Sequence, residues 1–143
     1  MLVSQILKDK GDMVFTATPV ETVSAVAVQL HVRRVGAVVV VSDAGEVVGI
    51  VSERDIVRTV AEKGATCLED PDERCMSREV VFAAPAETVD ALMERMTDRR
   101  IRHLPVVQDG RLVGIVSIGD LVKHKISEIE AEADGLKQYI AAG

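Results

Sequence analysis

The sequence predicts a mixed α/β (α+β) fold made of two tandem β-α-β-β-α repeats, related by a pseudo-two-fold axis, and a C-terminal helix. Two observations carry this prediction: a long internal repetition, and hydrophobic patterns that alternate between strand and helix periods within each copy. Residues 19–25 match residues 85–91, 66 positions later, and residues 49–55 match residues 114–120, 65 positions later. The offset changes once, at a turn, so the repetition indicates an internal duplication.

The first copy begins with a short apolar strand at residues 14–16. Pro19 marks the entry to a helix with Glu21 in its first turn, where proline and acidic residues are favoured. Gly36 is expected to end this helix. Its apolar residues recur with helical spacing, at Val23, Val26, Ala27 and Leu30.

A continuous β-branched run at residues 38–41 is typical of a strand covered on both faces. Residues 42–45 form a turn, and residues 47–51 form the returning strand. Ser52 then begins the next helix, because Ser52 with Asp55 is a variant of the capping box, in which two side chains satisfy free backbone N–H groups.

The second copy repeats this order and ends in a longer helix. Its predicted elements are the strand 80–82, the helix 88–97, the strands 104–107 and 112–116, and the helix after Ser117. Beyond Asp120 the apolar residues are spaced by four and three in turn, at Val122, Ile126, Ile129, Ala133, Leu136 and Ile140. This spacing is the heptad seam of a coiled coil.

The domain boundaries follow the repeat. We assign residues 2–64 to the first motif, residues 75–126 to the second and residues 121–141 to the C-terminal helix. Residues 65–74 contain Pro71 and four acidic residues, and they are predicted to form a surface connector.

Composition excludes several classes of function. The net charge is −6 at pH 7, whereas non-specific nucleic-acid binding needs a surplus of Lys and Arg. No apolar run approaches the roughly 20 residues of a membrane-spanning helix. Cys67 and Cys75 have no neighbouring histidine, so no metal motif forms, and a reducing cytoplasm is expected.

Two features resemble the cystathionine-β-synthase (CBS) domain, which usually occurs as a tandem pair called a Bateman module. Both copies carry Gly-h-h-Ser-x-x-Asp, where h is hydrophobic, at residues 49–55 and 114–120. The strand at residues 102–107 has the family's h-x-h-Pro type of pattern around Pro105. The resemblance covers about residues 2–126 and implies a stand-alone module, similar to small bacterial proteins made of a CBS pair. Plant relatives of those proteins regulate other enzymes.

The Ser-x-x-Asp corner suits a nucleotide for physical reasons. The helix N-terminus offers backbone N–H groups and a positive dipole end to a phosphate. The Asp can accept hydrogen bonds from a ribose diol, and the Gly lets a ligand approach a strand without meeting a Cβ. The alternative is that each corner is only a helix cap. The residues concerned are Gly49, Ser52 and Asp55 in the first copy and Gly114, Ser117 and Asp120 in the second.

The resemblance implies that the Ser contacts phosphate, the Asp contacts ribose hydroxyls and the adenine lies between strands. In related modules, basic side chains at the positions of Arg102 and His103 approach phosphates, and we expect Pro105 beside them to contact the ligand as well. The first copy has Gly36 and Ala37 there, which carry no charge.

Thr16 and Thr18 lie at the end of the first strand, where the family often supplies adenine or ribose contacts. Their counterparts in the second copy, Phe82 and Ala84, are apolar.

No catalytic motif is found: the sequence has no nucleophile elbow, His-Glu-x-x-His, Walker loop or Cys-x-x-Cys. We therefore expect a non-catalytic regulatory sensor with no catalytic cofactor and no metal. It would bind an adenine nucleotide in the cleft between the motifs and signal to an unidentified regulated enzyme through its dimer conformation. AMP is favoured for its single phosphate, with ADP, ATP, NAD(H) and S-adenosylmethionine as alternatives. The competing hypothesis is a scaffold or protein-interaction module with vestigial ligand sites, for example a modulator of another enzyme.

A homodimer is expected from the helices. The helix at residues 22–32 is apolar on more than one face, which leaves three residues outside its own core: Ala25, Val28 and Val32. The second copy is expected to offer a similar surface at Leu92, Met93 and Met96. The heptad seam either pairs with a partner helix or packs back onto the N-terminal segment at Leu2, Ile6 and Leu7.

Overall fold

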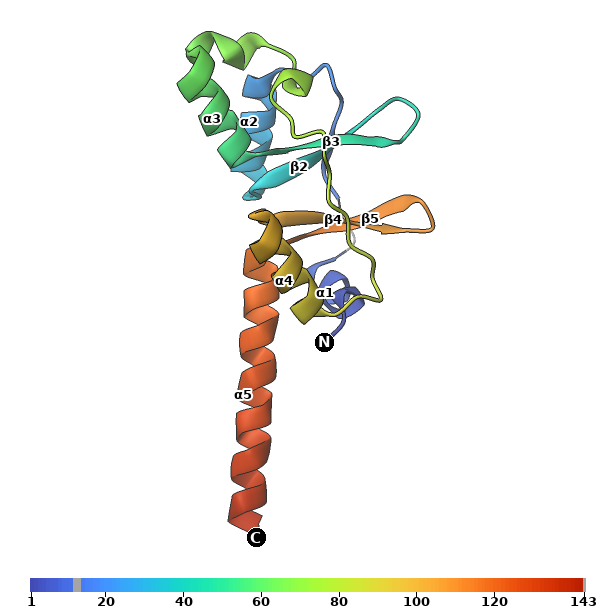
Figure 1. Cartoon of the computed structure of the whole chain (residues 1–143), viewed down its shortest axis with the longest axis vertical. Helices are drawn as coiled ribbons and strands as arrows, with labels where there is room; N and C mark the ends of the chain where they lie inside the picture. The colour runs from blue at the N-terminus through green and yellow to red at the C-terminus, as the bar shows by residue number, and fades with distance from the viewer. Residues whose placement is uncertain (12–13, 143) are drawn as a thin grey trace. The chain divides into compact units, whose positions relative to one another are not determined.

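The computed structural model of the chain describes residues 1–11 and 14–142. Its contacts divide the chain into two compact units (Figure 1). Residues 14–81 form the first-repeat unit. The N-terminal segment, together with the chain from Phe82 onward, forms the second-repeat unit. The predicted α+β class, with two repeats and a C-terminal helix, is confirmed.

The first-repeat unit is a three-stranded sheet with two helices packed on it. The strands are β1 (Thr16–Ala17), β2 (Ala37–Val41) and β3 (Val47–Ser52), in the order β1-β2-β3. β1 runs parallel to β2, and β2 runs antiparallel to β3. The helices are α2 (Val23–Arg33) and α3 (Glu53–Lys63). Four of the five β2 residues are buried, as the β-branched run predicted.

The second-repeat unit contains the hairpin of β4 (His103–Gln108) and β5 (Arg111–Ser117). Its helices are α1 (Val3–Lys10), α4 (Val89–Arg99) and α5 (Ile118–Ala142). The hairpin turns at Asp109 and Gly110, whose φ values are 52° and 75°, the left-handed conformation that a two-residue Asp-Gly loop requires. Leu92 and Leu104, both with 0% of their surface exposed, belong to its core.

The first predicted helix differs from the sequence expectation at both ends. The first helix begins at Val23, and Thr22 caps it by accepting a hydrogen bond from the Ala25 amide, so Pro19 and Glu21 precede the helix instead of opening it. The helix ends at Arg33, with Arg34 in the left-handed conformation, rather than at Gly36.

The short first strand of each copy also lies later than predicted. In the first copy it comprises residues 16–17. In the second copy residues 80–82 form no strand, and Ala83 alone makes a parallel bridge, with Val106. Short strands carry too few apolar residues for their periodicity to set a boundary.

The predicted surface connector is partly buried. It contains two short 3-10 helices, η1 (Ala65–Glu69) and η2 (Asp72–Arg74), and η1 packs against α2 and α3. Cys67 and Asp72 are buried within it. The connector thus completes the first-repeat unit, as α1 completes the second-repeat unit.

The predicted boundaries, 2–64 and 75–126, follow the order of the chain. In the structure, the segment before each repeat packs in the other unit: the N-terminal segment belongs to the second-repeat unit, and the connector belongs to the first-repeat unit. α1 precedes the first repeat but packs against β5 and α5 of the second-repeat unit. A repeat alone does not show which copy its leading segment completes.

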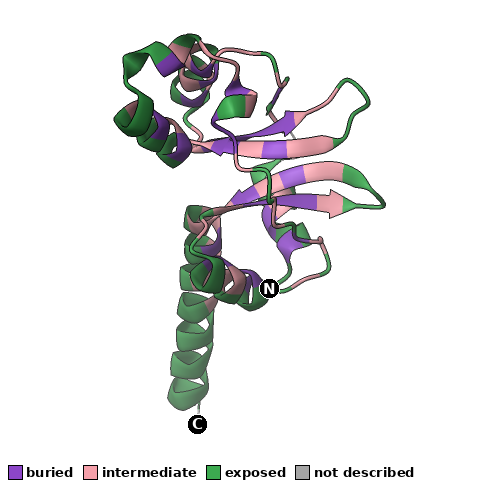
Figure 2. Cartoon of the chain, turned by 45° about the horizontal axis from the view of Figure 1, so that its top comes forward, coloured by how far each residue is buried: buried purple, intermediate pink, exposed green. Residues whose placement is uncertain are grey.

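The C-terminal helix α5 has 25 residues, and only its first part packs on the rest of its unit (Figure 2). Residues 129–142 are exposed throughout. The heptad seam therefore does not pack back onto Leu2, Ile6 and Leu7. Among the described residues, no helix is long and apolar enough to cross a membrane.

The outer faces of the other helices follow the expectation in part. Val28 and Val32 of α2 are 58% and 71% exposed, as predicted for residues outside the core of their own unit. Leu92 and Met96 of α4 are instead buried in their own core, so only the half-buried Met93 remains of the surface predicted there.

Candidate functional site

The strand-to-helix corner of the second-repeat unit forms the reciprocal cap that the sequence predicts. The Ser117 amide donates to Asp120 Oδ2 over 2.9 Å, and the Asp120 amide donates to Ser117 Oγ over 3.1 Å. His103 is the cross-strand partner of Ser117 in the β4–β5 hairpin. Arg102 precedes it, exposed, and its carbonyl oxygen accepts a hydrogen bond of 2.8 Å from the Ile118 amide. The structure thus brings together the predicted Arg102, His103, Ser117 and Asp120.

A residue that the sequence did not predict, Lys10 of α1, also belongs to this corner. Its Nζ lies 2.7 Å from Asp120 Oδ2 and donates to the Ile115 carbonyl oxygen over 2.9 Å. Partial burial by itself raises the pKa of Asp120, but the Lys10 ammonium and the Ser117 hydrogen bonds outweigh it and lower that pKa below its usual range. Asp120 is therefore held as a charged acceptor.

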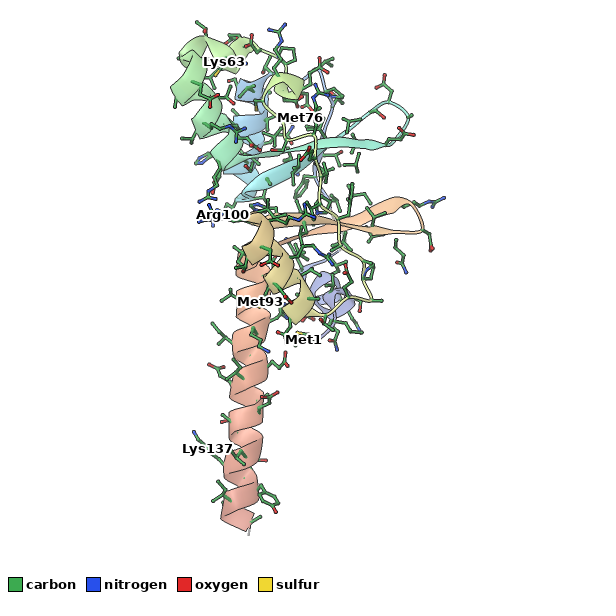
Figure 3. All side chains as sticks on the ribbon, viewed as in Figure 1. Met1, Lys63, Met76, Met93, Arg100 and Lys137 are labelled. Carbon is green, nitrogen blue, oxygen red and sulfur yellow. The ribbon has the colours of Figure 1, made fainter. Side chains whose placement is uncertain are left out.

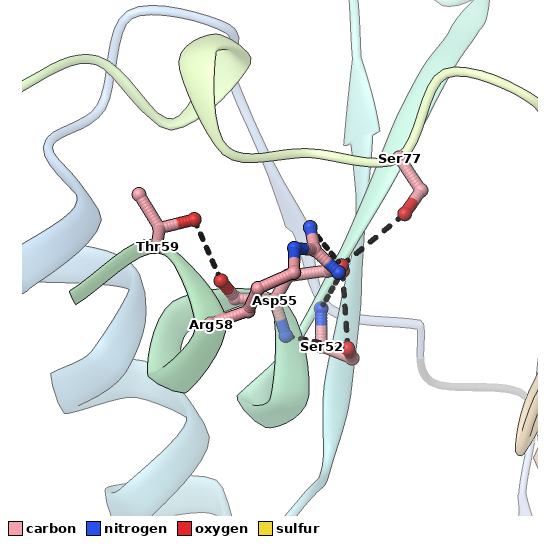
Figure 4. A network of polar contacts seen from close by, with 5 residues as sticks. All are labelled: Ser52, Asp55, Arg58, Thr59 and Ser77. Atoms are coloured by element: carbon pink, nitrogen blue, oxygen red, sulfur yellow. Dashed lines mark hydrogen bonds and ion pairs between the residues drawn. The ribbon is translucent and has the colours of Figure 1, made fainter. Parts of the chain in front are cut away.

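The matching corner of the first-repeat unit is a denser polar network (Figure 4). Asp55 Oδ2 accepts from the Ser52 amide over 2.9 Å and from the Ser52 hydroxyl over 3.0 Å. Asp55 Oδ1 pairs with Arg58 at 2.9 Å and accepts from the Ser77 hydroxyl over 3.2 Å. Asp55 is buried, and its own carbonyl accepts from Thr59 Oγ1 over 2.7 Å. Most of this carboxylate's hydrogen-bonding capacity is already used within the protein.

The helix N-termini offer fewer free N–H groups than expected. In the first-repeat unit the Glu53 amide donates to the Gly36 carbonyl and the Asp55 amide donates to Ser52 Oγ. In the second-repeat unit the Ile118 and Asp120 amides are used in the same way. Ser-x-x-Asp thus forms a helix cap in both copies. A phosphate here would depend more on side chains than on backbone N–H groups.

Gly49 and Gly114, at the same place in the two motifs, each have a side chain of the protein packed close to the Cα. A Cβ at Gly49 would lie 2.5 Å from Sδ of Met76, which reaches the strand from the segment that follows the connector (Figure 3). A Cβ at Gly114 would lie 2.4 Å from Cδ2 of Leu7. The close approach is therefore made by the protein's own side chains, so the Cβ-free faces predicted for a ligand are already covered.

The remaining candidates are spread along the strands. Pro105 is buried in β4. Thr16 of β1 pairs with Val39 of β2. It lies two strands across and two residues along the sheet from Ser52, so the two Cα atoms are roughly 12 Å apart in a standard sheet. Thr16 therefore lies away from the Ser52 corner. Thr18 is exposed beyond the end of β1, and its amide donates to Glu21 Oε2 over 2.7 Å.

Sequence reasoning missed Lys10, Arg58 and Ser77. Arg58 lies three residues after Asp55 on the same helix, a spacing at which opposite charges pair, so this contact was within reach of the sequence. Lys10 and Ser77 lie 110 and 22 residues from their aspartates, and no local pattern signals such contacts.

The chain is similar to known proteins of one family. A family model of the CBS domain matches residues 7–62 and 73–127. A CBS-domain protein of Agrobacterium tumefaciens is 44% identical, with a TM-score of 0.85 over 87% of this chain and 92% of that one.

Two further structures contain ligands. The CBS domain pair of protein MJ0100, in complex with 5-methylthioadenosine and S-adenosyl-L-methionine, is 28% identical, with a TM-score of 0.80 over 90% of this chain and 98% of that one. A CBS domain protein of Pyrobaculum aerophilum, complexed with AMP, is 30% identical, with a TM-score of 0.75 over 84% of this chain and 89% of that one. Both of the repeats found in the sequence are thus accounted for, and the chain belongs to the CBS-domain family as a tandem CBS pair.

Proposed function

We propose that this protein is a non-catalytic regulatory module that binds an adenine nucleotide, AMP above all, and signals through the conformation of a homodimer. ADP, ATP, NAD(H) and S-adenosylmethionine are the alternative ligands. Two similar CBS-domain proteins have solved structures in complex with ligands that contain an adenosine group, which supports this ligand class.

The observation that carries the proposal is the pairing of His103 with Ser117 across the hairpin, next to Arg102. Two basic residues therefore lie beside the corner that holds the charged Asp120 carboxylate. The side chains of Arg102 and His103 can bind a phosphate, and the Asp120 carboxylate can accept hydrogen bonds from the two hydroxyls of a ribose. This combination matches a nucleoside monophosphate better than a free sugar or a free base.

The two corners are proposed to differ in occupancy. In the first-repeat unit Gly36 and Ala37 take the places of Arg102 and His103, and Asp55 is committed to Arg58 and Ser77. The second-repeat corner therefore keeps more capacity for a ligand. We propose it as the principal site, with the first-repeat corner, Thr16 and Thr18 as contributors.

Lys10 has a defined place in this proposal. Its ammonium pairs with Asp120 at 2.7 Å, and 35% of its side chain is exposed, so we propose that it also contacts the phosphate of the ligand. If a ribose diol occupies Asp120, Lys10 can exchange its carboxylate contact for a phosphate contact. Because α1 carries Lys10, ligand binding would then be coupled to the position of α1.

The direct test is to identify what the protein carries and what stabilises it. Mass spectrometry of the purified protein under native conditions should show a bound adenylate, and a thermal-shift screen should raise the melting temperature with AMP more than with GMP or inorganic phosphate. Equal shifts with AMP and GMP would contradict adenine recognition. A melting temperature unmoved by every nucleotide would favour the alternative, a protein-interaction module that modulates another enzyme.

A further inference from the structure

The helix α5 has two faces with different surroundings. One face packs on its own unit: Leu121 is fully buried, Lys125 Nζ pairs with Asp90 at 3.0 Å, and Glu128 lies 3.7 Å from the N-terminal amine of Met1. At 100° per residue, the heptad seam lies about a quarter-turn around the helix from this face. The seam is therefore not used within the protomer.

The seam is apolar and exposed along about 27 Å of helix. Exposure rises from 39% at Val122 and 52% at Ile126 to 60% at Leu136 and 68% at Ile140. Lys137, next to the seam, projects freely from α5 (Figure 3). A regular row of large apolar side chains in water is unfavourable, so it requires a covering partner. Its period of 3.5 residues is that of a left-handed coiled coil.

We propose that α5 forms a parallel two-stranded coiled coil with α5 of a second copy of this chain. In heptad notation the a positions are Ile126, Ala133 and Ile140, and the d positions are Val122, Ile129 and Leu136. Isoleucine at a with leucine at d is favoured in parallel two-stranded coiled coils, and the last heptad has this combination in Leu136 and Ile140. The small Ala133 at the central a position lets the two backbones approach closely.

The charges that flank the seam fix the orientation. In a parallel pair each g residue faces the e residue five positions later on the partner helix. Lys125 would then face Glu130 of the second copy, and Glu132 would face Lys137 of the second copy. Both pairs are attractive, and the twofold symmetry forms each of them twice.

An antiparallel pair would bring e residues against e residues. Glu130 would then face Glu130 of the second copy, and Lys123 would face Lys137 of the second copy. Both contacts join like charges. The same sequence therefore favours the parallel pair and opposes the antiparallel one. Lys125 also pairs with Asp90 of its own protomer, so the Glu132–Lys137 contact is the cleaner one to test.

Disulfide trapping in the full-length chain tests the orientation. Leu136→Cys places two identical residues opposite each other at a d position only in a parallel, in-register pair. In an antiparallel pair that overlaps along the whole seam, each Leu136 would face a residue near Ile126, so the two cysteines would lie about 15 Å apart. Mild oxidation should yield a covalent dimer. The control Ala131→Cys lies on the outer f position and should not cross-link, nor should the wild type, whose two cysteines are buried.

A charge-reversal cycle tests the contact itself. Glu132→Lys and Lys137→Glu each turn two attractive contacts into repulsive ones, so each should weaken dimerisation by roughly tenfold at low salt. The double variant should restore it. Analytical ultracentrifugation gives the dissociation constants.

Each outcome decides the proposal. Cross-linking at residue 136 together with restoration in the double variant supports the parallel coil. A dimer that forms through other helices, without cross-linking at residue 136, overturns it, and so does a monomer. If the double variant binds no better than the single ones, the proposed g–e contacts are wrong.

Discussion

Asp72 occupies, in the first-repeat unit, the position that Val3 occupies in the second-repeat unit. The Asp72 amide donates to the Glu21 carbonyl over 2.7 Å, and the Val3 amide donates to the carbonyl of Glu87, the counterpart of Glu21, over 2.9 Å. Both side chains are 0% exposed. Within the described part of the chain, neither carboxylate oxygen of Asp72 has a hydrogen-bond partner. A carboxylate therefore fills an apolar position.

Because Asp72 stands where the other unit has Val3, the stability of the protein should depend on pH. Burial, helped by the charges of Glu21 and Glu73, raises the pKa of Asp72 from 3.8 to about 6. The folded state thus holds the proton of Asp72 more tightly than the unfolded state does. The stability that comes from this tighter proton binding is fully present below pH 4, near the unfolded pKa, and is lost as the pH rises through the folded pKa of about 6. Asp72→Val should remove the loss and raise the free energy of unfolding at pH 7.5 by about 3 kcal/mol.

Urea unfolding from pH 4 to pH 8 measures the effect. Asp72→Asn removes the charge without adding an apolar group, so it should flatten the same pH dependence with a smaller gain at pH 7.5. If the wild type and Asp72→Val lose stability in parallel between pH 4 and pH 7, the buried carboxylate is not the cause.

Replacing a glycine by alanine should lower stability at Gly49 and Gly114, the two motif glycines, but raise it at Gly135. Gly49→Ala and Gly114→Ala should each lower the free energy of unfolding by about 1–3 kcal/mol, because the new methyl group meets Met76 or Leu7. Gly135 lies in the helix α5 with open space around it, so Gly135→Ala should raise helix stability by about 1 kcal/mol. Thermal unfolding of the three variants compares them directly. A neutral Gly114→Ala would show that Leu7 does not pack there.

The Lys10–Asp120 pair predicts how the second-repeat corner titrates. Lys10→Met should raise the pKa of Asp120, because the ammonium that favours the carboxylate is gone. The stabilisation that this lowered pKa provides is present above the pKa that Asp120 has in the unfolded chain. It is lost as the pH falls through the pKa that Asp120 has in the folded protein. Lys10→Met should therefore lose stability above pH 4 but not at pH 2. The carboxyl resonance of Asp120, followed by NMR, reports the shift, and Lys8→Met on the same helix is the control.

The cysteines should be unreactive in the folded protein. Both are buried, and burial, together with the charges of Asp55 and Asp72, raises the pKa of the Cys75 thiol to about 11. Alkylation by iodoacetamide at pH 8 should be at least tenfold slower in buffer than in urea. Equal rates would mean that the segment around η2 opens readily.

The repeat allowed much of the fold to be predicted from sequence. Periodicity located α2, β2 and β3, and the Ser-x-x-Asp spacing located both helix caps, because these signals depend only on neighbours along the chain. The Asp-Gly turn sets the register of the hairpin at Gln108 and Arg111, but a β-bulge between Val106 and Val107 shifts it by one residue and pairs His103 with Ser117, which the turn alone does not predict.

The rest depends on contacts between distant segments. The exchange of α1 and the connector between the repeats places Lys10 on Asp120 and Leu7 on Gly114, and no periodicity encodes that exchange. Likewise, the acidic composition of residues 65–74 suggested a solvated surface, whereas Asp72 is buried there. Sequence alone thus located the corners but not what covers them.

Binding measurements on aspartate variants should show the difference between the corners. Asp120→Asn should weaken AMP binding by about 1–3 kcal/mol, because it removes the charged acceptor for the ribose diol at the corner that also holds Arg102 and His103. Asp55→Asn should weaken it less, although it breaks more contacts within the protein. Circular dichroism confirms that each variant is folded. A larger loss at Asp55 would reverse the assignment of the principal site.

Isothermal titration calorimetry of the wild-type protein with AMP at pH 7.5, after removal of any co-purified nucleotide, tests the central claim most directly. The account predicts saturable binding with a dissociation constant in the micromolar range, roughly 7–8 kcal/mol of binding free energy. The absence of both heat and a melting-temperature shift with any adenine nucleotide at millimolar concentration would contradict it.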